Sequence, residues 1–126
     1  MSSSFNTIAP VFLVEDVRLA AEHYRDKLGF EPGSYFGEPP EFTIVSRDGV
    51  KIAFSRACNG RGGSNRDYKE EAIDAYIWVG DVEALHQEFT ASGARVLGPP
   101  VSRDYGTREI EVRDLDGYVI CFGQLI

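Results

Sequence analysis

Apolar residues recur along this chain in two spacings, one helical and one strand-like. Intervals of three and four residues, which mark one face of an α-helix, appear first in this set: Val17, Ala20, Ala21, Tyr24 and Leu28. Asp16 precedes the set and can accept a hydrogen bond from a free N–H of the first turn. Gly29 follows it, at a position that favours a left-handed helix end. The pattern predicts a helix over residues 17–28.

A second helix is predicted from the same signals later in the chain. Val82, Leu85 and Phe89 repeat the helical spacing. Asp81 stands at the cap position, and Gly93 stands where the helix should stop. We therefore expect a helix over residues 82–92.

Short apolar or alternating runs, bounded by glycine and proline, predict the β-strands. They cover residues 7–14, 31–36, 41–46, 50–56, 73–79, 95–97, 107–113 and 118–124. The Asp-Gly pairs at 48–49 and 116–117 are strong turn signals. Residues 41–56 and 107–124 should therefore each form a hairpin.

The chain contains the same unit twice. The pattern Asp-Gly-x-x-Ile-x-Phe occurs at residues 48–54 and again at 116–122, and Val-x-Asp-Val occurs at 14–17 and again at 79–82. Each unit has the predicted order β, α, β, β, β. We expect a single domain made of two modules, residues 5–56 and 72–126, joined by a polar, glycine-rich linker over residues 57–71.

A more specific alternative is that the linker forms a phosphate-binding loop. It would need a helix that begins directly after the glycines, so that backbone N–H groups converge on the anion. The glycines at 60, 62 and 63 match neither nucleotide-binding motif. A connecting role is therefore favoured.

The chain is acidic, with a formal net charge of −7 and a pI near 4.8. Nucleic acids and anionic membranes attract basic surfaces, so neither is expected as a partner. If the partner is charged, a cation is favoured, although modest acidity also simply keeps a protein soluble. A hydrophobic share of 43% in 126 residues is enough for a core.

The cysteine pattern favours a reducing compartment. Cys58 and Cys121 belong to no CxxC pair, so neither a zinc site nor a disulfide framework is predicted. The N-terminus shows no basic and then apolar leader, and no run approaches the ~20 apolar residues of a membrane span. We expect a cytoplasmic protein.

Two βαβββ modules that open with Val-x-Asp-Val and close with Asp-Gly-x-x-Ile-x-Phe resemble the vicinal oxygen chelate superfamily. That family includes glyoxalase I, extradiol dioxygenases, fosfomycin-modifying enzymes and bleomycin-resistance proteins. The segments Tyr-Arg-Asp-Lys-Leu-Gly-Phe at 24–30 and Asp-Leu-Asp-Gly-Tyr at 114–118 are also similar to it, with Leu115 in place of the usual proline. The resemblance implies an α+β fold with an open, cup-shaped mixed β-sheet and helices on the outside. It says little about the reaction, because one fold hosts many functions.

The enzymes of this family hold a divalent metal with one residue from the first and last strand of each module, commonly His or Glu. The resemblance places these positions at Ala9, Ala53, Asp74 and Cys121. The two alanines have no donor atom, whereas a catalytic metal usually needs three protein ligands. His23 and His86 fall on the predicted helices, outside the cup. We therefore expect no metal and no other cofactor.

Strand alternation assigns side chains to the inside of the cup. In the second module this face receives Asp74, Tyr76, Trp78, Glu109, Glu111 and Cys121. Tyr35, Phe36 and Tyr105 lie near loops that could form its rim. Aromatic faces attract cations, and carboxylates would orient them. In the plainer interpretation the aromatic residues belong to the core, the glutamates lie on the solvated surface, and Cys121 is a small buried side chain that fills space in the core.

The resulting hypothesis is a bleomycin-resistance-like protein that binds and sequesters a small, cationic aromatic molecule without a metal, with a role in antibiotic resistance. Members of that branch bind at a dimer interface, so the resemblance also implies a homodimer. The alternative is a metal-dependent lyase, isomerase or extradiol-type dioxygenase with ligands relocated to Asp74, Glu109 or Glu111.

Overall fold

The computed structural model describes residues 3–60 and 62–126. The α-helices in this part of the chain are α1 (Val17–Leu28) and α2 (Val82–Ser92), with the predicted bounds. The Asp16 carboxylate accepts a hydrogen bond from the Leu19 N–H at 3.0 Å, and Gly29 ends α1 with a φ of 73°. Asp81 and Gly93 cap and end α2 in the same way. Both predicted helices and their caps are confirmed.

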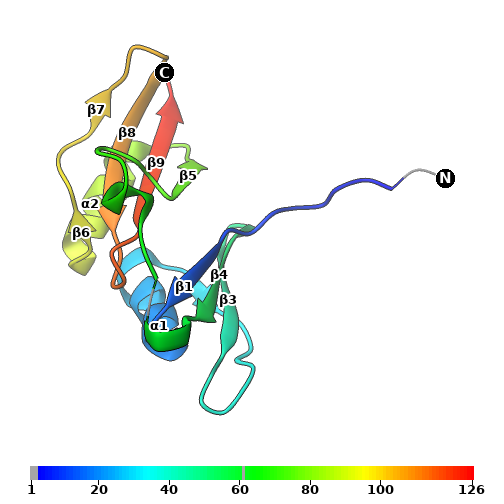
Figure 1. The fold of residues 1–126 in the computed structure, drawn as a ribbon. Coiled ribbons are helices and arrows are strands. Elements are labelled where there is room, and N and C mark those ends of the chain that lie inside the picture. The colour runs from blue at the N-terminus through cyan, green and yellow to red at the C-terminus, as the bar shows by residue number, and fades with distance from the viewer. Residues whose placement is uncertain (1–2, 61) are drawn as a thin grey trace.

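The first half of the chain forms a four-stranded sheet in the order β1, β4, β3, β2, and Figure 1 labels the first three of these strands. Its strands are β1 (Val11–Val14), β2 (Glu31–Pro32), β3 (Phe42–Arg47) and β4 (Val50–Arg56). Strand β1 runs parallel to β4, with Val11 opposite Ala53. Strands β3 and β4 form the predicted hairpin through Asp48 and Gly49, both of which have positive φ.

The second half repeats this plan in a sheet of order β5, β9, β8, β6, with β7 paired to β8. Its strands are β5 (Ala75–Trp78), β6 (Arg95–Val96), β7 (Val101–Ser102), β8 (Thr107–Arg113) and β9 (Val119–Leu125). Strand β5 is parallel to β9, and the other pairs are antiparallel. The α+β fold with mixed strands is confirmed. The described strands form two sheets and close no barrel.

Two predicted strands of the first half are shorter than expected. The strand predicted over 31–36 is limited to β2. The Gly33 N–H still donates to the Ile44 carbonyl oxygen at 2.8 Å, but the Ser34 carbonyl oxygen then accepts from the Thr43 hydroxyl in place of a backbone N–H, and Phe36 forms only a single bridge with Phe42. The strand predicted over 7–14 is limited to β1. Pro10 offers only its carbonyl oxygen, which accepts a hydrogen bond from the Ala53 N–H at 2.9 Å.

The second half differs from prediction at its edges and in the linker. Strand β5 is shorter than 73–79, and β7 was not predicted, because two residues are too few for a pattern. Within residues 57–71 the chain forms short 3-10 turns at Cys58–Gly60 and Asn65–Asp67. Residue 61 of the predicted linker lies outside the described residues. A three-residue turn is too short to supply the converging N–H groups of a phosphate loop.

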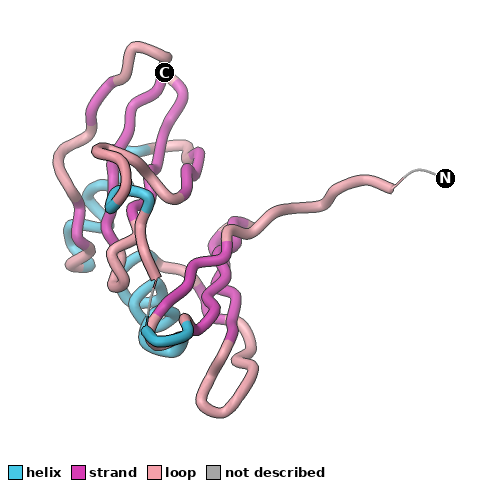
Figure 2. The backbone as a smooth tube through the Cα atoms, viewed as in Figure 1, coloured by secondary structure: helices cyan, strands magenta, loops and turns pink. Residues whose placement is uncertain are grey.

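Each helix covers one face of its own sheet (Figure 2). Helix α1 packs on β3 and β4, α2 packs on β8 and β9, and the helices also contact one another. The buried apolar residues form one cluster that spans both halves. Tyr24 lies inside it, with its ring centroid 4.9 Å from that of Phe54. The open face of each sheet is therefore the one turned away from its helix.

The two halves are joined by buried polar and aromatic contacts. The Tyr24 hydroxyl of α1 donates to the Asp114 carboxylate at 2.6 Å. The rings of Phe12 and Tyr118 stack with centroids 4.3 Å apart, and the Tyr118 hydroxyl donates to the Leu13 carbonyl oxygen. Asp114 is only 6% exposed, and burial raises its pKa to about 6. These contacts fix one half against the other.

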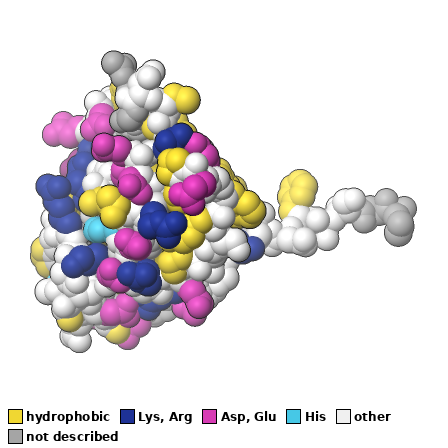
Figure 3. Space-filling model, turned by 90° about the horizontal axis from the view of Figure 1, so that it is seen from below, with side chains coloured by type: hydrophobic (Ala, Val, Ile, Leu, Met, Phe, Trp, Pro, Cys, Tyr) yellow, Lys and Arg dark blue, Asp and Glu magenta, His cyan; other side chains and the backbone are white. Residues whose placement is uncertain are grey.

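The N-terminal segment extends away from the body of the molecule (Figure 1). Phe5 and Ile8 of this segment are fully or largely exposed. On the face shown in Figure 3, basic and acidic side chains are interspersed and form no single-sign patch. None of the helices in residues 3–60 and 62–126 has the length and apolar character needed to span a membrane.

Candidate functional site

The open face of the second sheet gathers the chemistry-bearing side chains. Ile110, Val112, Ile120 and Phe122 turn toward α2 and are buried in the core. The alternate positions of the same strands therefore point away from the helix. The register sets Tyr76 opposite Cys121, and Cys121 opposite Glu111. These three side chains from β5, β9 and β8 thus stand side by side, as alternation predicts.

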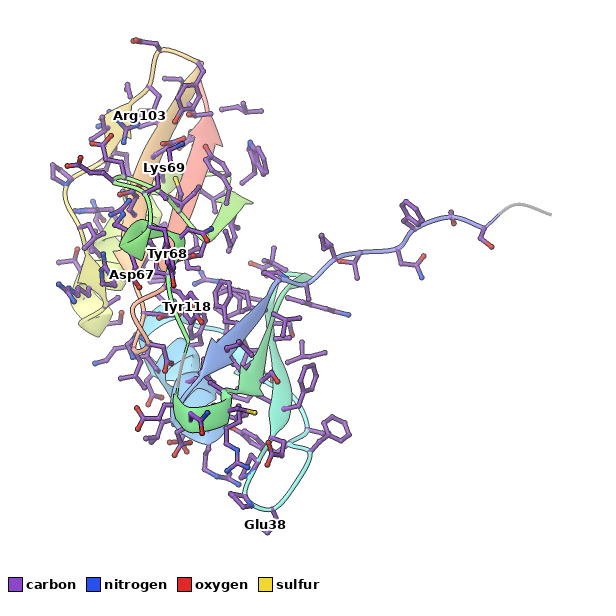
Figure 4. All side chains as sticks on the ribbon, viewed as in Figure 1. Glu38, Asp67, Tyr68, Lys69, Arg103 and Tyr118 are labelled. Atoms are coloured by element: carbon purple, nitrogen blue, oxygen red, sulfur yellow. The ribbon has the colours of Figure 1, made fainter. Side chains whose placement is uncertain are left out.

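A pocket of about 530 Å³ lies on this face, and we call it the cup pocket. Its strand-borne residues are Tyr76, Glu109, Glu111 and Cys121, and its loop-borne residues are Arg66, Glu70, Glu71, Ile73, Arg103 and Tyr105. Arg103 and Lys69 lie at the second-sheet end of the molecule, far from Glu38 (Figure 4). The volume lies within the range of small-molecule sites, ~300–1,000 Å³.

Glu109 is the most enclosed carboxylate of the cup pocket, at 4% exposed. It accepts hydrogen bonds from Tyr76 at 2.7 Å, Tyr105 at 2.9 Å and Thr107 at 2.9 Å, and from Arg103 Nε at 3.2 Å. Burial by itself would raise its pKa, but these donors outweigh burial and hold the pKa below the usual range. Glu109 is therefore ionised at neutral pH.

Burial and the hydrogen bond to Glu109 raise the pKa of Tyr76 to about 12, so this phenol remains protonated and donates. Burial, followed by the charges of Glu109 and Glu111, raises the pKa of the Cys121 thiol to about 12. A thiol needs a lowered pKa to act as a nucleophile. Cys121 therefore offers a small neutral surface to the pocket.

Two arginines balance part of the acidity expected of this face. Arg66 donates to Glu111 at 3.0 Å and to the Ala72 carbonyl oxygen at 3.0 Å. Arg103 pairs with Glu109, while its own side chain is 43% exposed. The residues lining the pocket comprise four carboxylates and two guanidinium groups, so the excess charge is negative. Sequence reasoning missed both arginines because each lies in a loop with no strand register.

Asp74 lies outside the cup pocket and has a structural partner set. Its carboxylate accepts the Ser64 hydroxyl at 2.6 Å, the Asn65 N–H at 2.7 Å and the Val119 N–H at 2.8 Å. These bonds fasten the end of the linker to β9.

Trp78 also lies outside the lining of the cup pocket. Its ring centroid lies 4.5 Å from that of Tyr76, and 64% of its surface is exposed.

Of the three predicted rim residues, only Tyr105 lines the cup pocket. Tyr35 belongs to the first half, where the Arg18 guanidinium lies 4.5 Å from its ring centroid. Phe36 is 61% exposed and pairs with Phe42 at the edge of the first sheet. The structure therefore brings Tyr76, Tyr105, Glu109, Glu111 and Cys121 together and leaves Tyr35, Phe36, Asp74 and Trp78 elsewhere.

The positions that correspond to the metal ligands of the family do not suit a divalent ion. Ala9 and Ala53 offer no donor atom. Both oxygens of Asp74 already accept hydrogen bonds, and Cys121 alone cannot supply the three protein ligands that a catalytic metal usually needs. Across residues 3–60 and 62–126, no group of three or more His, Cys, Asp or Glu side chains is placed to hold a metal. His23 and His86 lie on α1 and α2.

The sequence matches a family model over residues 5–122, and that family is described as the Glyoxalase/Bleomycin resistance protein/Dioxygenase superfamily. No curated protein sequence matches the chain.

Several solved structures share the fold. A bleomycin-binding protein from Streptomyces verticillus, complexed with copper(II)-bleomycin, has 26% identity and a TM-score of 0.70 over 98% of both chains. A glyoxalase-related enzyme from Clostridium phytofermentans has 13% identity and a TM-score of 0.79, also over 98% of both chains. TioX from Micromonospora sp. ML1 has 21% identity and a TM-score of 0.69, covering 96% of this chain and 97% of its own.

Proposed function

Because the chain belongs to the Glyoxalase/Bleomycin resistance protein/Dioxygenase superfamily, we propose that it is a bleomycin-resistance-like protein that binds and sequesters a small, cationic aromatic molecule without a metal. The observation that carries this proposal is the cup pocket, where two phenol rings stand among four carboxylates and two guanidinium groups. In this proposal the protein acts in the cytoplasm and protects against a toxic molecule such as an antibiotic.

The arrangement around Glu109 supports a cationic ligand. Glu109 is almost fully buried, whereas its partner Arg103 remains 43% exposed. A cationic group of a ligand can replace this guanidinium beside the carboxylate, because the arginine can swing into solvent while the glutamate cannot. The rings of Tyr76 and Tyr105 offer faces to a cation, an attraction of roughly 0.5–2 kcal/mol.

The bleomycin-binding protein from Streptomyces verticillus supports the choice of branch, since its structure was solved with copper(II)-bleomycin and its fold covers 98% of this chain. The donor set supports binding without a metal held by the protein, since two of the four family metal positions are alanines.

The same proposal includes a homodimer. The exposed apolar side chains on the open face of β1 support this part of the proposal, and they are Val11 and Leu13.

The test is a titration with copper(II)-bleomycin and with cationic aromatic dyes. Trp78, the single tryptophan, stands against the Tyr76 ring and should report binding by fluorescence. Glu109→Gln keeps the shape of the side chain but removes its charge. We expect this variant to bind about tenfold more weakly, which is roughly 1.4 kcal/mol. Glu38→Gln, in an exposed loop far from the pocket, is the matched control and should bind like the wild type.

If Glu109→Gln and wild type bind the cationic ligands with equal affinity, Glu109 does not recognise the positive charge, and that part of the proposal is wrong.

The enzyme alternative needs Asp74, Glu109 or Glu111 as metal ligands, and all three already have hydrogen-bonded partners. Turnover of methylglyoxal with glutathione, or cleavage of a catechol, would establish that alternative and overturn sequestration.

A further inference from the structure

A second cavity, of about 430 Å³, lies between the two halves, and we call it the inter-sheet pocket. The end of α1 and the start of β4 contribute Leu28 and Val50 from the first half. Strand β5 and α2 contribute Ile77 and Leu85 from the second half. This cavity and the cup pocket share no lining residue, so they are separate, although Trp78 of this lining stands against Tyr76 of the other.

The walls of the inter-sheet pocket are apolar but incompletely covered. Leu28 and Phe89 are almost fully buried at 0% and 1% exposed. Val50, Ile77 and Leu85 pack against the same core, yet each remains partly exposed. Side chains from both halves thus border a space that neither half fills. An apolar group placed there would remove apolar surface from water.

The rim of this pocket is charged, with negative charge in excess. Arg47 and Glu88 form a two-point ion pair, with nitrogen to oxygen distances of 2.6 and 3.0 Å. The Asp48 carboxylate lies 3.9 Å from Arg47 Nε, and its side chain is 92% exposed. Asp81, which caps α2, is the third carboxylate of the lining. The lining therefore includes three carboxylates and a single guanidinium group.

Trp78 completes the rim, with 64% of its surface exposed. An exposed indole face attracts cations more strongly than other aromatic rings do. The rim thus combines excess negative charge with an aromatic face, above an apolar interior. A molecule that matches these features has an apolar body and one positively charged end.

We propose that the inter-sheet pocket is a second ligand site, and that it takes a small hydrophobic amine. The apolar body lies among Val50, Ile77 and Leu85, and the ammonium group lies at the rim near Asp48 and Trp78. This site is independent of the cup pocket and of the function proposed for it. A ligand here would contact both halves of the molecule and favour their present arrangement.

The test uses amide NMR of the full chain, because Trp78 fluorescence would respond to ligands in either pocket. The probes are 4-phenylbutylamine, 4-phenylbutanol and 4-phenylbutyrate, which share a body and differ in the charge of the end group. We expect saturable shifts at Val50, Ala84 and Leu85, with the amine binding about tenfold more tightly than the carboxylate. Shifts confined to Tyr105 and Cys121, or equal affinity for amine and carboxylate, would overturn the proposal.

Two substitutions separate the apolar and charged parts of the site. Ala84 is exposed on α2 and lines the pocket, so Ala84→Leu should fill it and weaken all three probes about tenfold or more. Ala91→Leu makes the same change at an exposed position of α2 outside the pocket and should leave binding unchanged. Equal binding by these two variants would contradict the assigned location.

Asp48→Asn tests the charge, since asparagine tolerates the positive φ of 52° at this turn. This variant should weaken the amine by about threefold to tenfold and leave 4-phenylbutanol unaffected. If the amine and the alcohol respond alike to Asp48→Asn, the ammonium group is not held at this rim.

Discussion

Glu109 and Asp114 are both almost fully buried, yet their pKa values move in opposite directions. Glu109 receives hydrogen bonds from three side-chain hydroxyls and a guanidinium group, and its pKa falls below the usual value. Asp114 receives one hydroxyl and two backbone N–H groups, with the Asp116 charge nearby, and burial raises its pKa to about 6. The number and charge of the donors decide whether burial prevails.

The raised pKa of Asp114 predicts that this residue weakens the fold as the pH rises. Its folded-state pKa of about 6 exceeds the ordinary value of 3.8 for an aspartate, so the folded protein binds more protons between these values. The free energy of unfolding contributed by this group therefore falls as pH rises from 4 to 6, by at most about 3 kcal/mol.

Asp114→Asn should remove this loss, because its amide can keep partners at Tyr24 and at the backbone N–H groups. We expect urea unfolding to show the variant gaining stability relative to wild type between pH 4 and pH 7, by about 2 kcal/mol. An unchanged difference between the two proteins across this range would show that Asp114 ionises normally.

At the residue scale, the sequence predicted faces but not partners. Alternation along β5, β8 and β9 was enough to place Tyr76, Glu111 and Cys121 on one face. It could not show that Arg66 reaches Glu111 from a loop 45 positions away, nor that Asp74 would turn to the linker. Such contacts depend on the path of loops, which has no periodicity.

At the element scale, the helices were predictable because their signals are local. We expect Asp16→Ala to lower the free energy of unfolding by about 1 kcal/mol, since the Leu19 N–H would lose its acceptor. Asp16→Asn keeps an acceptor oxygen and should have a much smaller effect. Chemical denaturation of both variants checks this, and equal losses would mean that the charge of Asp16, and not its hydrogen bond, stabilises α1.

The hairpins were predictable for a similar reason, since Asp48 and Gly49 supply the positive φ that the turn requires. The strand predicted over 31–36 proved shorter, because the sequence Glu-Pro-Gly-Ser-Tyr-Phe does not reveal which of its residues pair with a neighbouring strand. Only β2 pairs with β3 there, and Phe36 returns to the sheet through one bridge.

At the scale of the whole molecule, the proposed homodimer gives a direct prediction. Leu13 points away from the core on β1 and is 48% exposed, so Leu13→Asp should shift the protein toward monomer in analytical ultracentrifugation at micromolar concentration. Leu19→Asp, at an exposed position of α1 with 52% exposure, is the control and should leave the assembly unchanged. A wild-type protein that sediments as a monomer would refute the dimer.

The arrangement of the two halves was not predictable from either half alone. It depends on Tyr24 reaching Asp114 and on Tyr118 stacking against Phe12, contacts that join residues 90 or more positions apart. The repeat in the sequence describes each half in isolation, and the inter-sheet pocket arises only from their docking.

The segment that connects the halves is also a wall of the cup pocket. Asp74 fastens Ser64 and Asn65, and Arg66, Glu70 and Glu71 then line the cavity. Ligand selectivity can therefore evolve by insertions, deletions or exchanges in this one stretch, while both sheets keep their sequence and stability. A protease cut at its exposed Lys69 would leave each sheet covalently whole and still dismantle the binding site.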